Sequence, residues 1–375
     1  MNQVLLVSDQ PMPNFLPILN SELKPDSVTL VVSDKMRNRA EWLKNEIQKH
    51  QVKILPDILI GANTSDINTI QNVLMDWAVA NGEVFADSML NVTGGTKPMA
   101  IAAQEVFRME KRPVFYVDIA TDKVTWVSGD QEVVSLVNQP TLNQFFGLNG
   151  ISIIEGDFKS VVENEKWRHF YGEIAAHPGK WASSIRALNG IAAQAEQEGT
   201  TDFFVTNATL DIPAWQEMND LLHGDELVCY RRERETFVSV EARRFCNGIW
   251  LEHYVFELLK SFGFDKKHAL MNVRLCDAKG NENELDAVVL HHNTCYVIED
   301  KTKNMRGSNI ADNAVYKLAQ LSAQMGLRAT GILVSALDVR RADKERAKAY
   351  NVKVFDWLPD LQTGLSRIFG VNLQA

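Results

Sequence analysis

The chain of 375 residues is long enough for two or three domains of about 150 residues each, which excludes a single small binding module. Its 45% hydrophobic and 23% charged residues are typical of a globular protein and exclude a disordered or membrane-embedded one. The net charge of −9 argues at first against a nucleic-acid partner, because proteins that bind nucleic acid usually carry a basic surface.

The first ten residues, MNQVLLVSDQ, contain a short apolar run with no basic segment before it, so we predict a buried strand and no signal peptide. No stretch approaches the roughly 20 apolar residues that cross a membrane. The cysteines lack CxxC spacing, which argues against disulfides or a thiolate zinc site and favours a reducing cytoplasm. The four are Cys229, Cys246, Cys276 and Cys295.

Apolar runs alternate with helical patterns through residues 1–140. The alternation predicts a parallel, doubly wound, Rossmann-like sheet, in which ligands bind beyond the carboxyl ends of the strands. The expected strands are 4–9, 27–34, 52–59, 88–95 and 112–120, and the expected helices are 36–49, 66–80 and 97–110.

Polar residues follow three of these strands. They are Ser8, Asp9, Gln10 and Asn14, then Ser33 and Asp34, then Thr93, Gly94, Gly95, Thr96 and Lys97. The glycines let backbone N–H groups approach a ligand, and the helix that follows favours an anion at its N-terminus. The spacing matches neither GxxxxGK(S/T) nor GxGxxG, which argues against a nucleoside-triphosphate hydrolase. An ordinary turn capped by Thr96 is the alternative interpretation.

Residues 141–240 lose the alternation of strands and helices. Helical spacing covers 181–197 and 212–222, and LVCYRRERETFVSV at 227–240 predicts a hairpin with charged residues between its strands. Helices followed by a charged hairpin predict a small winged-helix-like connector.

A second α/β core is predicted for residues 241–375. Its expected helices are 245–262, 314–325 and 340–350, and its expected strands are 283–290, 294–301, 331–337 and 352–358. If His292-Asn293 forms a two-residue turn, the antiparallel register places Asp286 opposite Glu299 and Glu284 opposite Lys301. One end of this hairpin then presents two carboxylates and an ammonium on one face, because opposed residues share a face.

The expected charge cluster lies where a buried strand should pack. Two opposed carboxylates repel unless a proton or a cation lies between them, and their hard oxygens suit Mg²⁺ or Mn²⁺. Lys301 can stabilise a phosphoryl transition state, and Glu252 on the preceding helix is the natural third carboxylate. The alternative is a hairpin whose charges are merely solvated, which fits badly with the apolar residues before Asp286 and Glu299.

These residues resemble the PD-(D/E)XK nuclease pattern of a helix Glu, then Asp, then Glu-x-Lys. The matching segments are Glu252, Leu285-Asp286 and Ile298-Glu299-Asp300-Lys301-Thr302, with Gly248-Ile-Trp-Leu before and Tyr316-Lys317-Leu318-Ala319-Gln320-Leu321 after. The resemblance implies a restriction-endonuclease-like α/β domain with catalytic Glu252, Asp286, Glu299 and Lys301. It also implies that the three carboxylates bind Mn²⁺ or Mg²⁺. Asp300, in the variable middle position, faces away and adds an acidic group of unknown use.

The SDQPMPN loop and TGGTKPM together resemble the ligand motif of CARF domains, the sensors of CRISPR systems. The order of a CARF-like sensor (1–140), a connector (141–240) and a PD-(D/E)XK domain (241–375) resembles the CRISPR-associated CARF nucleases. This resemblance implies a homodimer that binds a cyclic oligoadenylate, with cyclic tetra-adenylate expected, across its two-fold axis. The implied ligand-binding residues are Ser8, Asp9, Gln10, Asn14, Thr93, Gly94, Gly95, Thr96 and Lys97.

The leading hypothesis is therefore an ancillary effector of type III CRISPR antiviral defence: a cyclic-oligoadenylate-activated, metal-dependent endonuclease that cleaves or nicks DNA, with RNA as a second candidate substrate. The alternative is a ligand-responsive, DNA-binding transcription regulator with an inactive nuclease fold. Arg231, Arg232 and Arg234 favour that alternative, although Glu233 and Glu235 alternate with them as in a solvated hairpin. Cleavage of the cyclic ligand by the sensor itself is a third hypothesis, which the sequence does not decide.

The charge is unevenly distributed along the chain. Residues 301–350 contain ten Lys or Arg against four acidic residues, so this segment carries +6 and the remainder carries −15. The negative total thus averages an acidic body with a basic strip beside the expected active site, where a phosphate backbone would lie.

Overall fold

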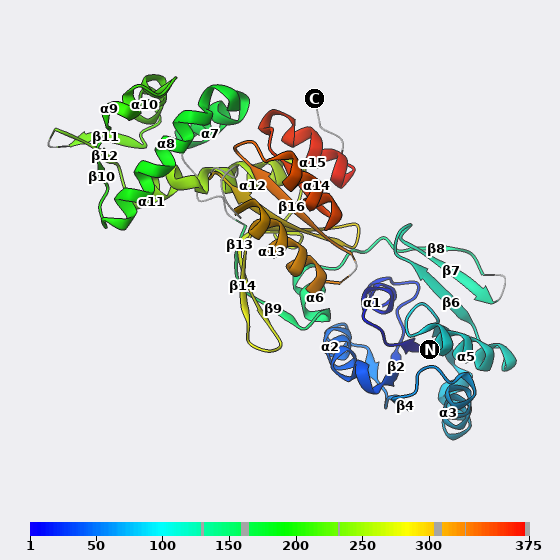
Figure 1. Ribbon diagram of the computed structural model, residues 1–375. Coiled ribbons are helices and arrows are strands. Elements are labelled where there is room, and N and C mark those ends of the chain that lie inside the picture. Colours follow the sequence, from blue (N-terminus) through cyan, green and yellow to red (C-terminus); the bar gives the residue numbers. More distant parts are fainter. Residues whose placement is uncertain (129–130, 159–164, 232, 304–309, 327, 372–375) are drawn as a thin grey trace.

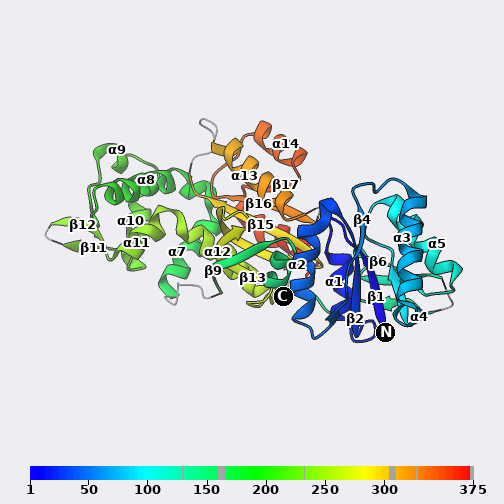
Figure 2. The same ribbon diagram turned by 90° about the horizontal axis from the view of Figure 1, so that it is seen from below.

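The computed structural model describes residues 1–128, 131–158, 165–231, 233–303, 310–326 and 328–371. An N-terminal α/β domain lies at one end, a largely helical middle region lies at the other, and the C-terminal α/β domain lies between them (Figures 1 and 2). Chain order therefore differs from spatial order, and the C-terminal domain contacts both of the others. In the part of the chain that is described, no helix is both long enough and apolar enough to cross a membrane.

The N-terminal sheet has the order β3-β2-β1-β5-β6-β7-β8, and β4 also pairs with β2. Its parallel strands are β1 (Asn2–Leu6), β2 (Ser27–Ser33), β3 (Lys53–Ile54), β4 (Ile58–Gly61), β5 (Ser88–Asn91) and β6 (Val114–Asp118). The predicted doubly wound parallel sheet is thus confirmed. Two antiparallel strands that we did not predict, β7 (Lys123–Ser128) and β8 (Val134–Ser135), extend one edge.

Helices cover both faces of this sheet, which explains the continuous apolar run in β1. Leu5 packs into one core with α1, α2 and α6, whereas Val4 and Leu6 pack into the other with α3 and α5. The helices are α1 (Met12–Leu19), α2 (Arg37–Gln48), α3 (Ile67–Ala80), α4 (Gly82–Ala86), α5 (Lys97–Met109) and α6 (Leu142–Leu148), with a 3₁₀ turn at Asp34–Met36. Thr96 caps α5 by accepting a hydrogen bond from the Met99 N–H.

The middle region consists of α7 (Glu165–Ala176), α8 (Pro178–Gln197), β10 (Asp202–Phe203), α9 (Asn207–Leu210), α10 (Trp215–Gly224), β11 (Val228–Arg231), β12 (Arg234–Phe237) and α11 (Val240–Arg244). From α8 onwards the order is helix, strand, two helices and a hairpin, and the sheet order is β10-β12-β11, as in a winged-helix domain. The expected hairpin is β11–β12. Arg232, at its turn, lies outside the described residues.

The C-terminal sheet has the order β17-β16-β15-β14-β13-β9. Its strands are β9 (Ile151–Asp157), β13 (Ala269–Asp277), β14 (Glu282–His291), β15 (Thr294–Lys301), β16 (Ala329–Ser335) and β17 (Val352–Phe355). β9 comes from the range expected to form the connector and pairs antiparallel with β13. The sheet therefore includes one strand that lies far from the others in the sequence.

The hairpin β14–β15 has the predicted two-residue turn. His292 and Asn293 both have positive φ, 45° and 57°, as a type I′ turn requires. The ladder runs from His291–Thr294 to Ala287–Ile298, in the predicted register. The expected pairings of Asp286 with Glu299 and of Glu284 with Lys301 are not formed, because the ladder with β15 ends at Ala287–Ile298. On its other edge, β14 pairs Glu284 with Arg274 of β13.

The C-terminal helices lie on both faces of this sheet. They are α12 (Trp250–Ser261), α13 (Ile310–Gln324), α14 (Arg341–Ala349) and α15 (Leu361–Phe369), with a π-helical segment at Phe245–Ile249 and a 3₁₀ turn at Leu358–Asp360. Leu318 and Leu321 of α13 pack on one face, in a core that continues into the N-terminal domain, and Phe256 and Leu259 of α12 pack on the other. The two α/β domains thus share one hydrophobic core.

Candidate functional site

Two carboxylates converge on one lysine at the carboxyl end of β15. The Lys301 Nζ lies 2.6 Å from Glu299 Oε1 and 3.8 Å from Asp286 Oδ2. Strand alternation places Glu299 and Lys301 on one face, and the adjacent strand brings Asp286 to them. The structure therefore brings together three of the residues that the sequence selected.

The end of the β14–β15 ladder positions Asp286. Asp286 lies one residue beyond Ala287, the last residue of β14 that pairs with β15. Its Oδ2 accepts a hydrogen bond from the backbone N–H of Asp300 at 2.7 Å. Burial raises the pKa of Asp286, and the negative charge of Glu299 raises it further, whereas Lys301 opposes both effects. The carboxylate is thus held in a fixed orientation by the neighbouring strand.

Glu252 lies in the first turn of α12, is half-buried and feels the charges of Asp286, Lys301 and Glu299. Burial raises its pKa to about 8, and the charge of Asp286 adds to this effect. The preceding π-helical segment contains Gly248 at φ 126°, where a side chain would overlap the hydroxyl of Thr302 just after β15. This close approach ties the start of α12 to the strand that bears Glu299.

Asp300 lies between Glu299 and Lys301 on β15, so strand alternation directs its side chain away from theirs, yet the charges of Asp286 and Glu252 still act on it. Its side chain is buried, and burial raises its pKa well above the ordinary value. Neither of its carboxylate oxygens has a hydrogen-bond partner among the residues that the structure describes. A protonated, neutral Asp300 is the form that this environment favours.

Lys317 joins the cluster although sequence reasoning did not select it. Its Nζ, on α13, lies 2.7 Å from Glu299 Oε2, so each oxygen of Glu299 contacts a different lysine. The only available signal was its place in the segment 316–321, where the resemblance expects polar site residues. Helical spacing alone does not reveal which residue of that segment faces the active site.

The carboxylates of this cluster are arranged around ammonium groups. Across the described ranges, no three His, Cys, Asp or Glu side chains have the spacing that holds a metal ion. Asp286 and Glu299 nevertheless direct oxygens at the same point, the position of Lys301 Nζ. Because Mg²⁺ is commonly bound by one or two carboxylates together with substrate phosphates, this donor pair fits such an ion by type and number.

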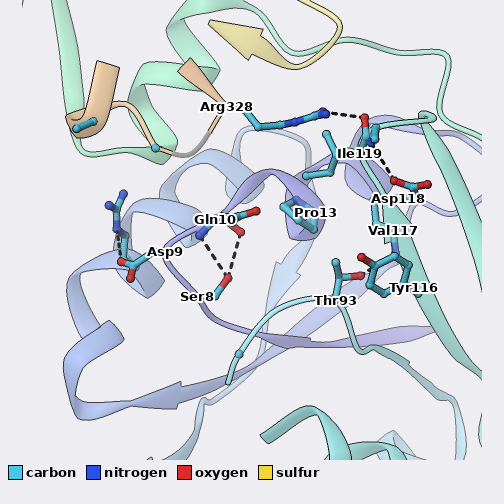
Figure 3. Close-up of a pocket in the computed structure, with 15 residues that line it drawn as sticks. Ser8, Asp9, Gln10, Pro13, Thr93, Tyr116, Val117, Asp118, Ile119 and Arg328 are labelled. Carbon is cyan, nitrogen blue, oxygen red and sulfur yellow. Dashed lines mark hydrogen bonds and ion pairs between the residues drawn. The ribbon is translucent and has the colours of Figure 1, made fainter. Parts of the chain in front are cut away.

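A cavity of about 870 Å³ lies at the carboxyl ends of β1, β5 and β6 (Figure 3). The predicted residues that line it are Ser8, Asp9, Gln10, Thr93 and Gly95. Sequence reasoning missed the other polar contributors, which are Arg39 of α2, Tyr116 and Asp118 of β6, and Arg328 of the C-terminal domain. The pocket therefore forms where doubly wound sheets bind ligands, but it has a wall from a second domain.

The remaining predicted ligand residues lie beside this pocket and do not line it. Asn14 is buried and donates from Nδ2 to the carbonyl of Leu6 at 2.8 Å. Gly94 packs so closely on the same carbonyl that any side chain would overlap it. Thr96 caps α5, and Lys97 is the exposed first residue of that helix.

Charged groups at the pocket are partly paired. Asp9 lies 3.5 Å from the Nε of Arg39, and Nη1 of Arg39 donates to Asn149 at 3.0 Å. Arg328 Nη1 donates to the backbone carbonyl of Ile119 at 2.8 Å (Figure 3). Two guanidinium groups thus border the cavity together with the carboxylates of Asp9 and Asp118, and the guanidinium groups are the ones that can contact an anionic ligand.

Two family models match the sequence in the order of these sites. Residues 3–143 match the Card1 CARF domain, and residues 239–368 match the Card1-like endonuclease domain. The chain joins a CARF domain to a Card1-like endonuclease domain. No curated protein matches its sequence. The pocket belongs to the CARF domain, and the cluster of Asp286, Glu299 and Lys301 belongs to the endonuclease domain.

Solved structures resemble the whole chain. VC1899 from Vibrio cholerae is 23% identical, with a TM-score of 0.87 and 98% of each chain covered. Can2 from Sulfobacillus thermosulfidooxidans, in complex with cyclic tetra-adenylate, is 26% identical, with a TM-score of 0.81 and 98% of each chain covered. A type III CRISPR defence DNA nuclease activated by cyclic oligoadenylate is 15% identical, with a TM-score of 0.53, and 98% of this chain matches 52% of that one. The CARF and endonuclease domains thus share their arrangement with proteins of this architecture.

Proposed function

We propose that this protein is an endonuclease of type III CRISPR antiviral defence that is activated by a cyclic oligoadenylate. The observation that carries the proposal is the presence of two sites in one chain. They are a pocket bordered by Arg39 and Arg328, and a cluster of two carboxylates and two lysines around the buried Glu299. The likeness to Can2 bound to cyclic tetra-adenylate, over 98% of both chains, supports that ligand. The sensor function belongs to residues 1–140 and the nuclease function to residues 241–375, joined by the connector 141–240.

The pocket would bind the anionic ligand through groups at the strand ends. Backbone N–H groups around Thr93 and Gly95 can approach phosphate because Gly95, at φ 72°, has no side chain. Ser8, Asp9 and Gln10 would contact ribose or base. The chain would act as a homodimer, in which a second copy completes the pocket and places Lys97 near the ligand phosphates.

The cluster would hydrolyse a phosphodiester. Asp286 and Glu299 would hold Mn²⁺ or Mg²⁺, with Glu252 as the third carboxylate, and such an ion supplies a Lewis acid for phosphoryl transfer. Lys301 and Lys317 place positive charge where negative charge develops on the phosphate. Without a cation, burial raises the pKa of Glu252 to about 8, and a bound divalent cation would favour its ionised form.

The regulator hypothesis is less well supported. In a winged-helix domain the helix before the hairpin enters the DNA groove, and here that helix is α10. Its exposed residues include the acidic Glu217 and Asp220, which would repel phosphate. The basic segment 301–350, beside the cluster, is a better surface for DNA, with RNA as a second candidate substrate. Arg306 of this segment lies outside the described residues.

The test incubates the full chain with supercoiled plasmid, single-stranded DNA and single-stranded RNA. Each reaction contains Mn²⁺, Mg²⁺ or a chelator, with and without cyclic tetra-adenylate. We expect DNA cleavage that requires both the divalent ion and the ligand. Cleavage in chelator would contradict the metal requirement, and the absence of cleavage in every reaction would favour the regulator.

A further inference from the structure

The CARF pocket has a wall that belongs to the endonuclease domain. Ala323, Gly326 and Arg328 line it, and they lie between the last turn of α13 and the start of β16. Figure 3 shows Arg328 reaching over the pocket from the opposite side to Ser8 and Thr93. A ligand in this pocket would therefore contact both domains of the same chain.

Arg328 is anchored in one domain and reaches the other. Its backbone carbonyl accepts a hydrogen bond from the N–H of Cys295 in β15 at 2.9 Å, while its Nη1 donates to the Ile119 carbonyl of the CARF domain at 2.8 Å. A guanidinium carries five N–H donors, so it can bind a phosphate oxygen while the contact with Ile119 persists. Arg328 is thus placed to contact an anionic ligand from the endonuclease side.

The same wall is continuous with the active site through α13. Lys317, which contacts Glu299 at 2.7 Å, lies six residues before Ala323 of the pocket wall, or about 9 Å along the helix. Leu318 and Leu321 of α13 are buried in the shared core, as is Met325 just after the helix, so this part of α13 is packed from the active site to the pocket wall. A shift of the pocket wall would therefore move the helix that carries Lys317.

We propose that Arg328 binds the ligand from the endonuclease domain and that α13 transmits this contact to Lys317. This inference rests on the proposed function, because it requires an anionic nucleotide in the CARF pocket. The ligand would favour the arrangement of α13 in which Arg328 contacts phosphate, and it can shift the equilibrium only as far as its affinity differs between arrangements. Arg328 is then both a ligand-binding residue and a positioning residue for the nuclease.

A second contact between the two domains does not touch the pocket and provides a control. Asn293, in the turn of the β14–β15 hairpin, donates from Nδ2 to Asp122 of the CARF domain at 2.6 Å. Neither residue lines the cavity. Asn293→Gly keeps the positive φ that the turn requires and removes only this side-chain contact. It therefore weakens the domain contact without changing the pocket.

The experiment compares wild type, Arg328→Ala, Arg328→Lys and Asn293→Gly as full chains. Calorimetric titration measures the affinity for cyclic tetra-adenylate, DNA cleavage is measured with and without saturating ligand, and thermal unfolding verifies that each variant folds. We expect Arg328→Ala to bind about tenfold more weakly, because a charge-assisted contact is lost. Its cleavage at saturating ligand should also fall by at least about fivefold. Arg328→Lys should recover part of the affinity, and Asn293→Gly should bind like wild type.

Three outcomes would overturn the inference, and the third would also contradict the proposed function. If Arg328→Ala binds the ligand as wild type does, Arg328 is not a ligand contact. If saturating ligand activates Arg328→Ala fully, α13 does not transmit the contact. If wild type itself binds no cyclic tetra-adenylate, the proposed function fails and the inference fails with it.

Discussion

The CARF pocket collects polar groups from strand ends, loops and a helix around an open cavity, whereas the endonuclease cluster is centred on a carboxylate buried at the end of a strand. The side chain of Asp9 is 75% exposed, and that of Glu299 is 5% exposed. Burial raises the pKa of Glu252, Asp286 and Asp300, whereas hydrogen bonds from Thr121 and Ala120 lower the pKa of Asp118 at the pocket. One site is arranged for chemistry and the other remains accessible to a ligand.

This contrast predicts that substitutions in the two sites separate catalysis from sensing. The cluster depends on fixed charges at short distances, so losing one charge should abolish cleavage while ligand binding persists. The pocket depends on many weaker contacts, so single substitutions there should be graded. The predictions below test this separation in order of decreasing effect.

The largest effect is expected for Lys301→Ala. The change removes the ammonium on which Asp286 and Glu299 converge, and cleavage should fall by roughly a thousandfold. Affinity for cyclic tetra-adenylate, measured by calorimetry, should stay at the wild-type value. Lys303→Ala, in the same segment but at an exposed position, is the matched control. Cleavage by Lys301→Ala at the rate of the control would remove Lys301 from the active site.

Gly248→Ala should destabilise the endonuclease domain by roughly 1–3 kcal/mol, because the new methyl group would overlap the hydroxyl of Thr302. Displacement of α12 should also move Glu252 and lower cleavage. Thermal unfolding measures the first effect. Gly263→Ala is the control, since Gly263 also has positive φ but nothing lies within 4 Å of its added methyl group. If both variants lose the same stability, backbone strain alone explains the loss and the contact with Thr302 does not contribute.

The two domains should respond to pH with opposite sign. Burial raises the pKa of Glu252 to about 8 in the folded state, so the folded protein binds this proton more tightly than the unfolded chain does. The stabilisation that the proton provides is lost as the pH rises from about 5 to 8. The slope for one such group is at most about 1.4 kcal/mol per pH unit. Burial instead lowers the pKa of His50 in the CARF domain, so the unfolded chain binds this proton more tightly than the folded protein does. The free energy of unfolding therefore decreases as the pH falls below about 6.5.

Unfolding temperatures from pH 5 to pH 8 test both signs. Glu252→Gln should reduce the loss of stability toward pH 8, and His50→Gln should reduce the loss toward pH 5. Added Mn²⁺ should stabilise wild type most at high pH, because a cation offsets the repulsion among the ionised carboxylates. A pH profile of Glu252→Gln that matches wild type would contradict the burial of an ionisable group at that position.

The smallest effect is expected for Lys97→Ala. Lys97 is exposed and does not line the pocket of a single chain, and we expect it to contact the ligand in the proposed dimer. We expect an affinity loss of about threefold to tenfold, which is typical of a partly solvated charge contact. Sedimentation with and without ligand measures the dimer in the same samples. Full affinity of Lys97→Ala in a dimeric sample would remove Lys97 from the binding site.

The sequence was sufficient to predict local geometry. The turn residues His292 and Asn293 set the hairpin register, and alternation along β15 placed Glu299 and Lys301 together, because both rules act between neighbours along one chain segment. The parallel N-terminal sheet followed from the spacing of apolar runs. The pairing predicted beyond Ala287 was wrong, because the ladder between β14 and β15 ends there. The backbone N–H of Asp300 donates to the side chain of Asp286 and not to a backbone carbonyl of β14.

Contacts between distant elements could not be predicted. Lys317 reaches Glu299, and Arg328 reaches a carbonyl about 200 residues earlier, only because of how α13 packs on the sheet and how the domains meet. No local spacing encodes such packing. For the same reason β9 was not recognised as an edge strand of the C-terminal sheet. Lys317 and Arg328 were thus missed because both make contacts between elements that are distant in the sequence.

The most direct test of the account is the rate of plasmid cleavage by the full chain in Mn²⁺ as cyclic tetra-adenylate is titrated, with Lys301→Ala measured in parallel. We expect the cleavage rate of wild type to rise by roughly 5- to 150-fold with ligand, and the cleavage rate of Lys301→Ala to stay at background. A wild-type rate that is the same without ligand would contradict a ligand-controlled nuclease.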